Sequence, residues 1–255
     1  MDIFSRPLAS LLAFFFQLVP NYAVAIGLLT ITVMIVLLPL TLKGTRSMLA
    51  MQRLAPEIKK LQDKHKNDRQ KLNEEVMAVY RDNKINPLGG CLPLLLQLPV
   101  FFVLYTVING LTARNKEGLI TPKFLDADSE LFQRLREDAG TMVSFGVDLA
   151  KSATDSHGSF VAGMPFYALL VIMVLAQYYQ QRQMTNNAPP SADTPQAQQL
   201  KMFQKFYPPF FGLISLGFPA ALVLYWVISS LFRIVQQWAM YRFCLLYTSP
   251  SPRDS

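Results

Sequence analysis

The stretch FYPPFFGLISLGFPAALVLYWVISSL, from Phe206 to Leu231, carries no charge over its 26 residues. A helix that spans a bilayer needs about 20 mostly apolar residues, so this stretch is too long for one ordinary span and too short for two of full length. Gly217-Phe218-Pro219 lies in its middle, and this sequence is typical of a helix end followed by a new start. We therefore predict two short spanning helices, Leu200 to Leu216 and Ala220 to Met240.

Three further apolar segments complete a predicted bundle of five spans. Each is uncharged and close to spanning length: Tyr22 to Leu42, Gly89 to Leu111 and Val161 to Gln181. The chain is 51% hydrophobic and 16% charged, whereas soluble domains usually carry about 25% charged residues. We therefore predict an all-α integral membrane protein whose five-span core covers residues 21–243.

The charges between the apolar segments predict the orientation. Residues Lys43 to Lys84 contain eleven Lys and Arg against six Asp and Glu, whereas the loop 112–163 contains six against eight. Because Lys and Arg accumulate in short cytoplasmic loops, we expect the first region inside the cell and the second outside. The loop 182–199 and the end near Arg242 are then cytoplasmic, and the N-terminus is outside.

The two ends of the chain differ from the five-span core. In the N-terminal region 1–20, the apolar run Pro7 to Val19 reaches only about 20 Å at 1.5 Å per residue, which favours an interfacial helix. A cleaved signal peptide is the alternative, because Arg6, the apolar run and Ala23-Val24-Ala25 resemble its three regions. Residues 244–255 abandon the helical pattern for Ser, Pro and Thr, and we expect them to be a non-native tail.

Residues 43–85, between the first two predicted spans, carry the pattern of a helical hairpin. Apolar side chains recur there at steps of three and four residues: Met48, Met51, Ala55, Ile58 and Leu61, then Leu72, Val76, Val79 and Tyr80. Pro56 suits a first helical turn, and Asn67-Asp68 supplies a turn and an N-cap. We predict a basic cytoplasmic hairpin that attracts anionic lipid headgroups or ribosomal RNA; a solvated loop is the alternative.

The segment that follows, NPLGGCLPLLLQLP from Asn86 to Pro99, places three prolines and two glycines at the mouth of a span. Pro93 and Pro99 each remove a backbone donor, which predicts an irregular helix inside a packed bundle or wet cavity. The predicted spans contain no Asp, Glu or His, and the chain shows no common catalytic motif and no cysteine spacing for a metal. An enzyme, a cofactor or a metal site is therefore not expected.

These motifs resemble the YidC/Oxa family of membrane-protein insertases. The resemblance rests on NPLGGCLPLLLQLPVFFVLY (86–105) and FPAALVLYWVISSLFRIVQQ (218–237), with PLT (39–41) and LAPEIKKLQDKH (54–65) in the same order. It implies a bacterial cytoplasmic-membrane insertase and foldase with a hydrophilic groove open to cytosol and lipid. Its implied partners are nascent membrane proteins, the ribosome and, for some clients, the Sec translocon, with no role for DNA.

The resemblance also implies groove residues, with one departure. In the family the groove cation is an arginine of the first span, five residues before the proline of the PLT-like motif, and here that position is Met34. Thr30 matches a position that contacts substrate, and the pair Tyr225-Trp226 matches aromatic residues that face the groove. The alternative for the aromatic pair is an interfacial belt or bundle packing. Gln177 is a candidate for a further polar wall of the groove.

Arg233 is a candidate replacement for the missing cation. Helical spacing places it on one face of the last span with Trp226 and with polar residues: Ser229 or Ser230, and Gln236 or Gln237. The alternative is that Arg233 snorkels to the cytoplasmic headgroups. For Gln97 and Asn109 we expect hydrogen bonds to neighbouring helices.

Two other functions compete with insertion. A diverged assembly chaperone for few clients would keep the fold, with Met34 as the sign of divergence. A transporter or channel would predict repeated halves or charged residues along a permeation path, and the spans show neither. The external loop contains a predicted short helix, Ser129 to Ala139, and its function is not assigned.

Overall fold

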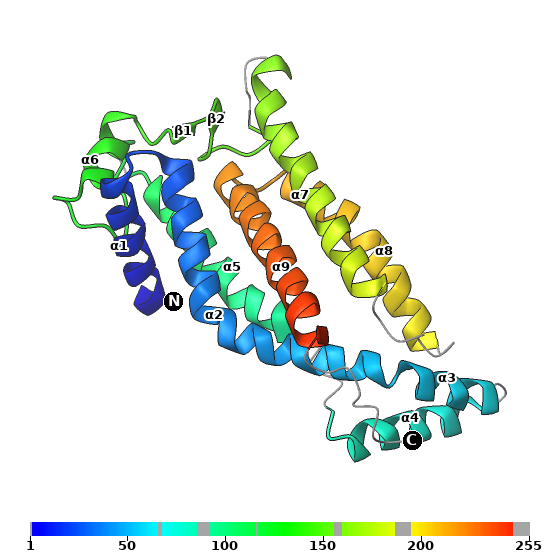
Figure 1. The fold of residues 1–255 in the computed structure, drawn as a ribbon. Helices are drawn as coiled ribbons and strands as arrows, with labels where there is room; N and C mark the ends of the chain where they lie inside the picture. The colour runs from blue at the N-terminus through cyan, green and yellow to red at the C-terminus, as the bar shows by residue number, and fades with distance from the viewer. Residues whose placement is uncertain are drawn as a thin grey trace.

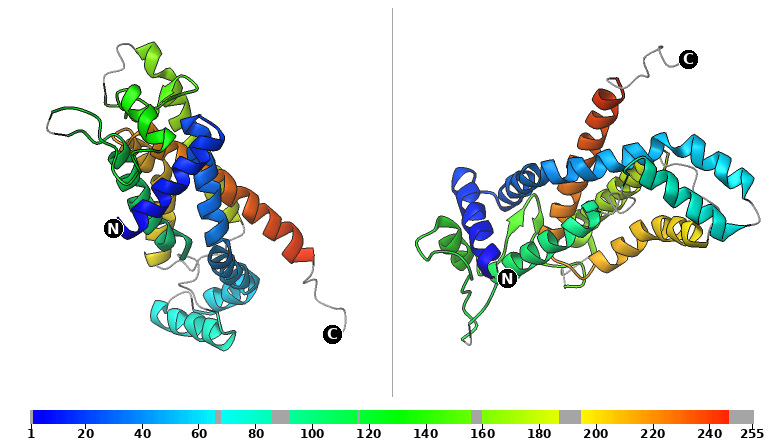
Figure 2. Two further views of the ribbon diagram at one scale, coloured as in Figure 1. Left: turned by 90° about the vertical axis from the view of Figure 1, so that its left-hand side faces the viewer. Right: turned by 90° about the horizontal axis from the view of Figure 1, so that it is seen from below.

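The computed structural model describes residues 2–65, 68–85, 92–115, 117–155, 160–186 and 195–246. The elements in these residues (Figure 1) are α1 (Asp2–Leu18), α2 (Tyr22–Arg53), α3 (Ala55–Lys64), α4 (Arg69–Asp82), α5 (Leu92–Leu111), α6 (Glu130–Glu137), β1 (Val143–Ser144), β2 (Val147–Asp148), α7 (Phe160–Asn186), α8 (Pro195–Ser215) and α9 (Ala220–Leu246). Long helices form a bundle, and α3 and α4 lie beyond one of its ends (Figures 1 and 2). The predicted helical fold is confirmed.

Helices form at each of the five predicted spans. Three of them contain segments long and apolar enough to cross a membrane: Tyr22–Ser47, Gly163–Gln183 and Ala220–Met240. The apolar part of α5, Leu96–Leu111, is shorter, so the count of five spans stays a prediction. The break predicted at Gly217-Phe218-Pro219 is confirmed, because α8 ends at Ser215 and α9 begins at Ala220.

Several helix boundaries differ from the sequence-based expectation. Helix α2 continues to Arg53, eleven residues past Leu42, because the charges that end an apolar span do not by themselves break a helix. Met48 and Met51 therefore belong to α2, and the chain breaks only at Leu54, ahead of Pro56. Helix α5 is continuous from Leu92 to Leu111, contrary to the irregular helix we expected.

Local physics explains the continuity of α5 and the lengths of the terminal helices. Pro93 falls in the first turn of α5, where a backbone N–H has no partner within the helix, so only Pro99 interrupts the hydrogen bonding. Helix α1 begins at Asp2, ahead of the expected Pro7, and α9 runs three residues past Phe243. Residues 86–91, 187–194 and 247–255, which include the NPLGGC motif and most of the tail, lie outside the described residues.

The bundle core is apolar, and glycines allow its helices to approach closely. A Cβ on Gly27 would lie 3.3 Å from Cδ1 of Ile228, so the small residue lets α2 meet α9. A Cβ on Gly212 would lie 2.7 Å from Cγ2 of Val174, so a larger residue there would force a shift between α8 and α7. Small residues are typical of helix contacts in membranes.

Residues 112–155 cover one end of the bundle, which we name the loop end. The backbone N–H of Ala220 donates to the carbonyl oxygen of Lys151 at 2.8 Å, and that of Ala153 donates to Leu216 at 3.1 Å. The predicted short helix is α6, and Ser129 caps it by accepting from the N–H of Phe132 at 3.3 Å. The loop thus satisfies backbone groups where α8 ends and α9 begins.

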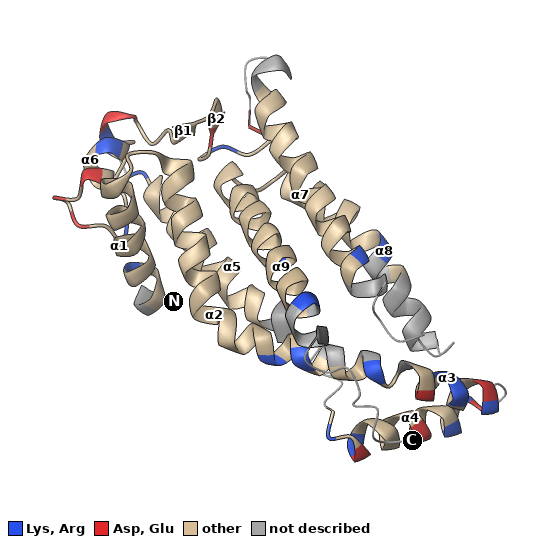
Figure 3. Ribbon diagram, in the orientation of Figure 1, with Lys and Arg blue, Asp and Glu red and all other residues tan. Residues whose placement is uncertain are grey.

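Helices α3 and α4 pack side by side at the other end of the bundle. Asp68 caps α4 by accepting from the N–H of Lys71 at 3.0 Å, as the sequence predicts. Glu75 of α4 lies 3.0 Å from Nε2 of His65, at the end of α3. Figure 3 shows charged residues on α3 and α4 at this end and around α6 at the loop end, and the middle of the bundle is free of acidic residues. The cytoplasmic position of this pair stays a prediction.

Candidate functional site

A chain of polar side chains links α5 to α9 inside the bundle. The Gln97 side chain lies between two residues of α9: its Nε2 donates to the Tyr225 hydroxyl, and its Oε1 accepts from Nη2 of Arg233. Tyr225, Ser229 and Arg233 recur every four residues, so the helical period places them on one face of α9. The expectation that Gln97 bonds to a neighbouring helix is confirmed, whereas Asn109 is exposed.

Arg233 is a cation without an acidic partner in the bundle. Helices α2, α5, α7, α8 and α9 contain no Asp or Glu. Arg233 lies thirteen residues from each end of α9, which is about 20 Å from either end. Its Nε–H is buried and donates to no acceptor among the described residues. An ionisable residue at such a position is expensive in a membrane and marks a functional site by default.

A second polar contact joins α9 to α2. Nε2 of Gln236 donates to Oγ1 of Thr41 at 3.1 Å. Thr41 ends the PLT motif, but the sequence analysis gave its side chain no role. The signal that could have found it was a polar threonine at the edge of an apolar span.

Thr30 and Met34 are both buried on α2. Thr30 is fully buried, and its Oγ1 donates to the carbonyl oxygen of Ile26 at 2.7 Å, so its own helix satisfies the hydroxyl. Met34 is 3% exposed and belongs to the apolar core. An apolar contact therefore fills the position where the resemblance implies a cation.

The pair Tyr225-Trp226 divides between a polar and an aromatic environment. Tyr225 is fully buried and bonded to Gln97. The Trp226 ring stacks on Phe101 with centroids 5.1 Å apart and meets Phe211 edge-on at 4.5 Å. Trp226 thus joins α5, α8 and α9 through aromatic packing. This arrangement agrees with bundle packing as the alternative role of Trp226.

Two further glutamines, one on α7 and one on α9, carry buried acceptors. Oε1 of Gln177 on α7 and Oε1 of Gln237 on α9 are buried and have no hydrogen-bond partner among the described residues. Gln237 lies one helical turn after Arg233, so the two side chains share a face of α9. The sequence analysis selected Gln177 and placed Gln237 only as one of two residues on a polar stripe.

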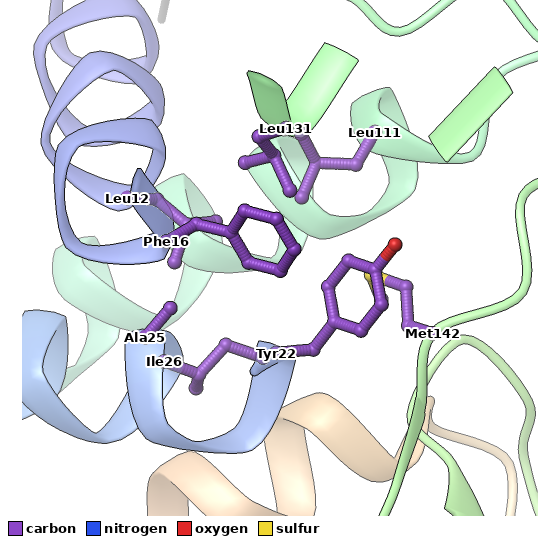
Figure 4. A pocket seen from close by; sticks show the side chains of 8 residues that line it. All are labelled: Leu12, Phe16, Tyr22, Ala25, Ile26, Leu111, Leu131 and Met142. Carbon is purple, nitrogen blue, oxygen red and sulfur yellow. The ribbon is translucent and has the colours of Figure 1, made fainter. Parts of the chain in front are cut away.

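A separate pocket at the loop end is apolar. It lies between α1, α2, α5 and the loop (Figure 4) and is lined by Leu12, Phe16, Tyr22, Ala25, Ile26, Leu111, Leu131 and Met142. The Phe16 and Tyr22 rings lie 4.8 Å apart, and the Tyr22 hydroxyl donates to Oδ2 of Asp138 at 3.1 Å. The pocket has no charged lining residue, and its side chains serve to pack α1 and the loop onto the bundle.

Comparison with known proteins finds one matching family and several relatives that are named as membrane-protein insertases. Residues 14–245 match the family model described as 60Kd inner membrane protein. A protein of Nitratidesulfovibrio vulgaris named Membrane protein insertase YidC is 36% identical over 239 residues, covering 93% of this chain and 38% of that protein. Proteins with the same name from Maridesulfovibrio salexigens and Streptomyces avermitilis are 38% and 34% identical, and the matches cover 94% and 91% of this chain but 38% and 52% of theirs.

A solved structure agrees with the sequence matches. It is titled as the crystal structure of an active YidC insertase with the first transmembrane domain resolved. The TM-score is 0.54 at 27% identity, and the match covers 92% of this chain and 45% of that chain. The chain spans about two-fifths of the length of the Nitratidesulfovibrio and Maridesulfovibrio relatives that it matches, 38% in each. The YidC/Oxa resemblance is thereby confirmed, and the chain belongs to the 60Kd inner membrane protein family.

Proposed function

We propose that this chain is a membrane-protein insertase that inserts and helps fold nascent membrane proteins in the bacterial cytoplasmic membrane. The observation that carries the proposal is the polar chain of Gln97, Tyr225 and Arg233 inside a bundle of apolar helices with no acidic residue. The names of the relatives, Membrane protein insertase YidC, supply the class of activity. No nucleotide or covalent chemistry is part of the proposal.

The physical task is to lower the cost of moving a polar segment through lipid. Burying an unpaired amide or hydroxyl in an apolar medium costs roughly 2–7 kcal/mol, depending on the reference state. A polar segment that meets hydrogen-bonding side chains partway across the membrane lacks hydrogen-bond partners over a shorter distance. In this proposal a groove lined by the polar faces of α5, α7 and α9 supplies those groups, and the hydrophobic part of the client leaves sideways into lipid.

Arg233 takes the place of the missing first-span cation in this proposal. Met34 lies in the apolar core, so α2 offers no charge at the position that the resemblance implies. Arg233 is at the midpoint of α9, and its guanidinium donates to Gln97 of another helix. These contacts support a role inside the bundle over snorkelling, which brings cationic side chains near helix ends to the headgroups.

The proposed topology has five spans, with the N-terminus outside, the C-terminus in the cytoplasm and α1 at the outer interface. The charge difference between Lys43 to Lys84 and residues 112–163 supports this orientation. The basic pair α3 and α4 is then cytoplasmic, where its exposed charges suit anionic headgroups and the ribosome. The insertase would act alone or beside the Sec translocon.

The direct test is insertion into vesicles that contain the purified chain and no other protein. A ribosome-synthesised client with one span and a short translocated tail is added, and the protease-protected fraction is measured. We expect protection well above that of protein-free vesicles of the same lipids. Equal protection in both vesicle preparations would contradict insertase activity for this chain.

An assembly chaperone for few clients is the second candidate, and the buried Met34 favours it. A site whose cation has moved to another helix would suit a narrower set of clients. Depleting the protein and counting the membrane proteins that are lost separates the two: a broad loss indicates a general insertase, and the loss of a few indicates a specialist.

A further inference from the structure

Three buried polar atoms near the middle of the bundle lack hydrogen-bond partners among the described residues. They are the donor Nε of Arg233 and two acceptors, Oε1 of Gln237 and Oε1 of Gln177. Buried polar groups in folded proteins are nearly always paired, so each exception requires an explanation. We name these three residues the open polar set.

The members of the open polar set lie at one level of the bundle. Arg233 and Gln237 share a face of α9, and α7 packs along α9. Both helices start at the loop end: Ala220 bonds to Lys151, and a Cβ on Gly146 would lie 4.0 Å from Cγ of Pro165 in α7. At 1.5 Å per residue, Arg233 and Gln177 each lie roughly 20 Å from those contacts.

We propose that the open polar set binds the main chain of an extended client segment while that segment crosses the membrane. A client carbonyl would accept from Nε of Arg233, and client N–H groups would donate to the oxygens of Gln237 and Gln177. This inference rests on the proposed insertase function and names the chemical group that the site recognises. It requires no particular client side chain.

The match of donors and acceptors supports a peptide ligand. Every residue except proline carries one backbone donor and one acceptor, and an extended segment in a membrane has no internal partner for either. A transmembrane helix has already satisfied both, so the set would retain an unfolded segment and release a helical one. A carboxylate fits less well, because the two glutamine oxygens would repel it.

The test uses two clients that differ in one residue of the translocated tail. One tail is built from Gly, Ser and Asn, and the other carries a single Asp in the same sequence. Each is inserted by vesicles holding the full chain, Gln237→Leu or Gln177→Leu. Gln236→Leu is the matched control, because that neighbouring amide is already bonded to Thr41. Loss of one neutral hydrogen bond predicts about a five-fold lower insertion rate for both tails.

Thermal unfolding separates this role from a structural one. Replacing an unpaired buried amide by Leu removes a polar group without breaking a bond, so Gln237→Leu and Gln177→Leu should unfold at the same or a higher temperature while inserting more slowly. Replacing one amide of the client tail by an ester removes a backbone N–H. This change should lower the insertion rate with the wild type and leave the insertion rate with the slower of the two variants unchanged.

Each outcome is decisive. If the variants lose insertion of the client with the Asp tail alone, the site recognises side-chain charge and not the main chain. If both variants insert both tails as the wild type does, the open polar set has no role in insertion. Both results would leave the insertase function intact. Failure of the wild type to exceed protein-free vesicles with either tail would instead overturn the proposed function itself.

Discussion

Replacing Gln97 by Leu tests whether Arg233 is a buried charge that depends on this one amide. The substitution removes the acceptor of the Arg233 guanidinium and the donor to the Tyr225 hydroxyl. Hydrogen bonds between membrane helices contribute on average about 0.6 kcal/mol each, so two lost bonds alone would cost about 1 kcal/mol. Leaving a buried charge without its partner costs more, about 3–5 kcal/mol.

A double-mutant cycle with Arg233→Met distinguishes the cost of the lost hydrogen bonds from the cost of a buried charge without its partner. We expect Gln97→Leu to lower the free energy of unfolding by about 3 kcal/mol in the wild type, because the charge is stranded. In the Arg233→Met background only the bond to Tyr225 remains to be lost, so the same change should cost about 0.6 kcal/mol. The coupling between the two positions is then roughly 2 kcal/mol, within the range for residues in one hydrogen-bond network.

Unfolding by SDS titration in mixed micelles measures both values. Asn109→Leu is the control, because Asn109 is an exposed amide on the same helix and surface changes usually stay within about 0.5 kcal/mol. If the cost of Gln97→Leu agrees within about 0.5 kcal/mol in the two backgrounds, the sites are independent. The guanidinium would then find headgroups or water on its own, and the buried-cation reasoning would be refuted.

Three further substitutions test the fold at α8, at α4 and at the loop end. Gly212→Leu should destabilise the protein by about 1–3 kcal/mol through overpacking against Val174, seen as a lower unfolding temperature; a neutral result would mean that α7 and α8 separate easily. Asp68→Ala should cost about 1 kcal/mol of helix stability and speed hydrogen exchange in the first turn of α4, whereas unchanged exchange would rule out the cap. Ser144→Ala should speed hydrogen exchange at the N–H of Ala23, because this N–H donates to Oγ of Ser144 at 3.3 Å. An exchange rate equal to that of the wild type would show that the loop does not hold the start of α2.

Local signals in the sequence predicted many of the elements. Gly217-Phe218-Pro219 marked the break between α8 and α9, Ser129 marked the start of α6, and Asp68 marked the start of α4. These signals act over a few residues, through backbone conformation and capping hydrogen bonds. The end of α2 was missed for the same reason: Lys43 ends the apolar pattern, but a helix continues until its backbone is interrupted near Pro56.

The polar chain was predictable only in part. The period of α9 placed Tyr225 and Arg233 on one face, and an amide in an apolar span made Gln97 a candidate for bonding between helices. The sequence did not show that Gln97 and Arg233, 136 positions apart, meet each other. It also assigned Thr30 and Trp226 to the same groove, whereas the structure satisfies Thr30 within its own helix and packs Trp226 among aromatic rings.

Composition, helical period and turn residues are properties of short segments, so they predict a bundle of apolar helices with Arg233 inside the last span. The side chains that surround Arg233 follow only from how the helices pack against one another. The rotation and tilt of α5, α7 and α9 about one another depend on packing, such as the close approach of Gly27 to Ile228, and no single segment encodes them. The same packing buried Met34 in the core and left the oxygens of Gln177 on α7 and Gln237 on α9 without partners among the described residues.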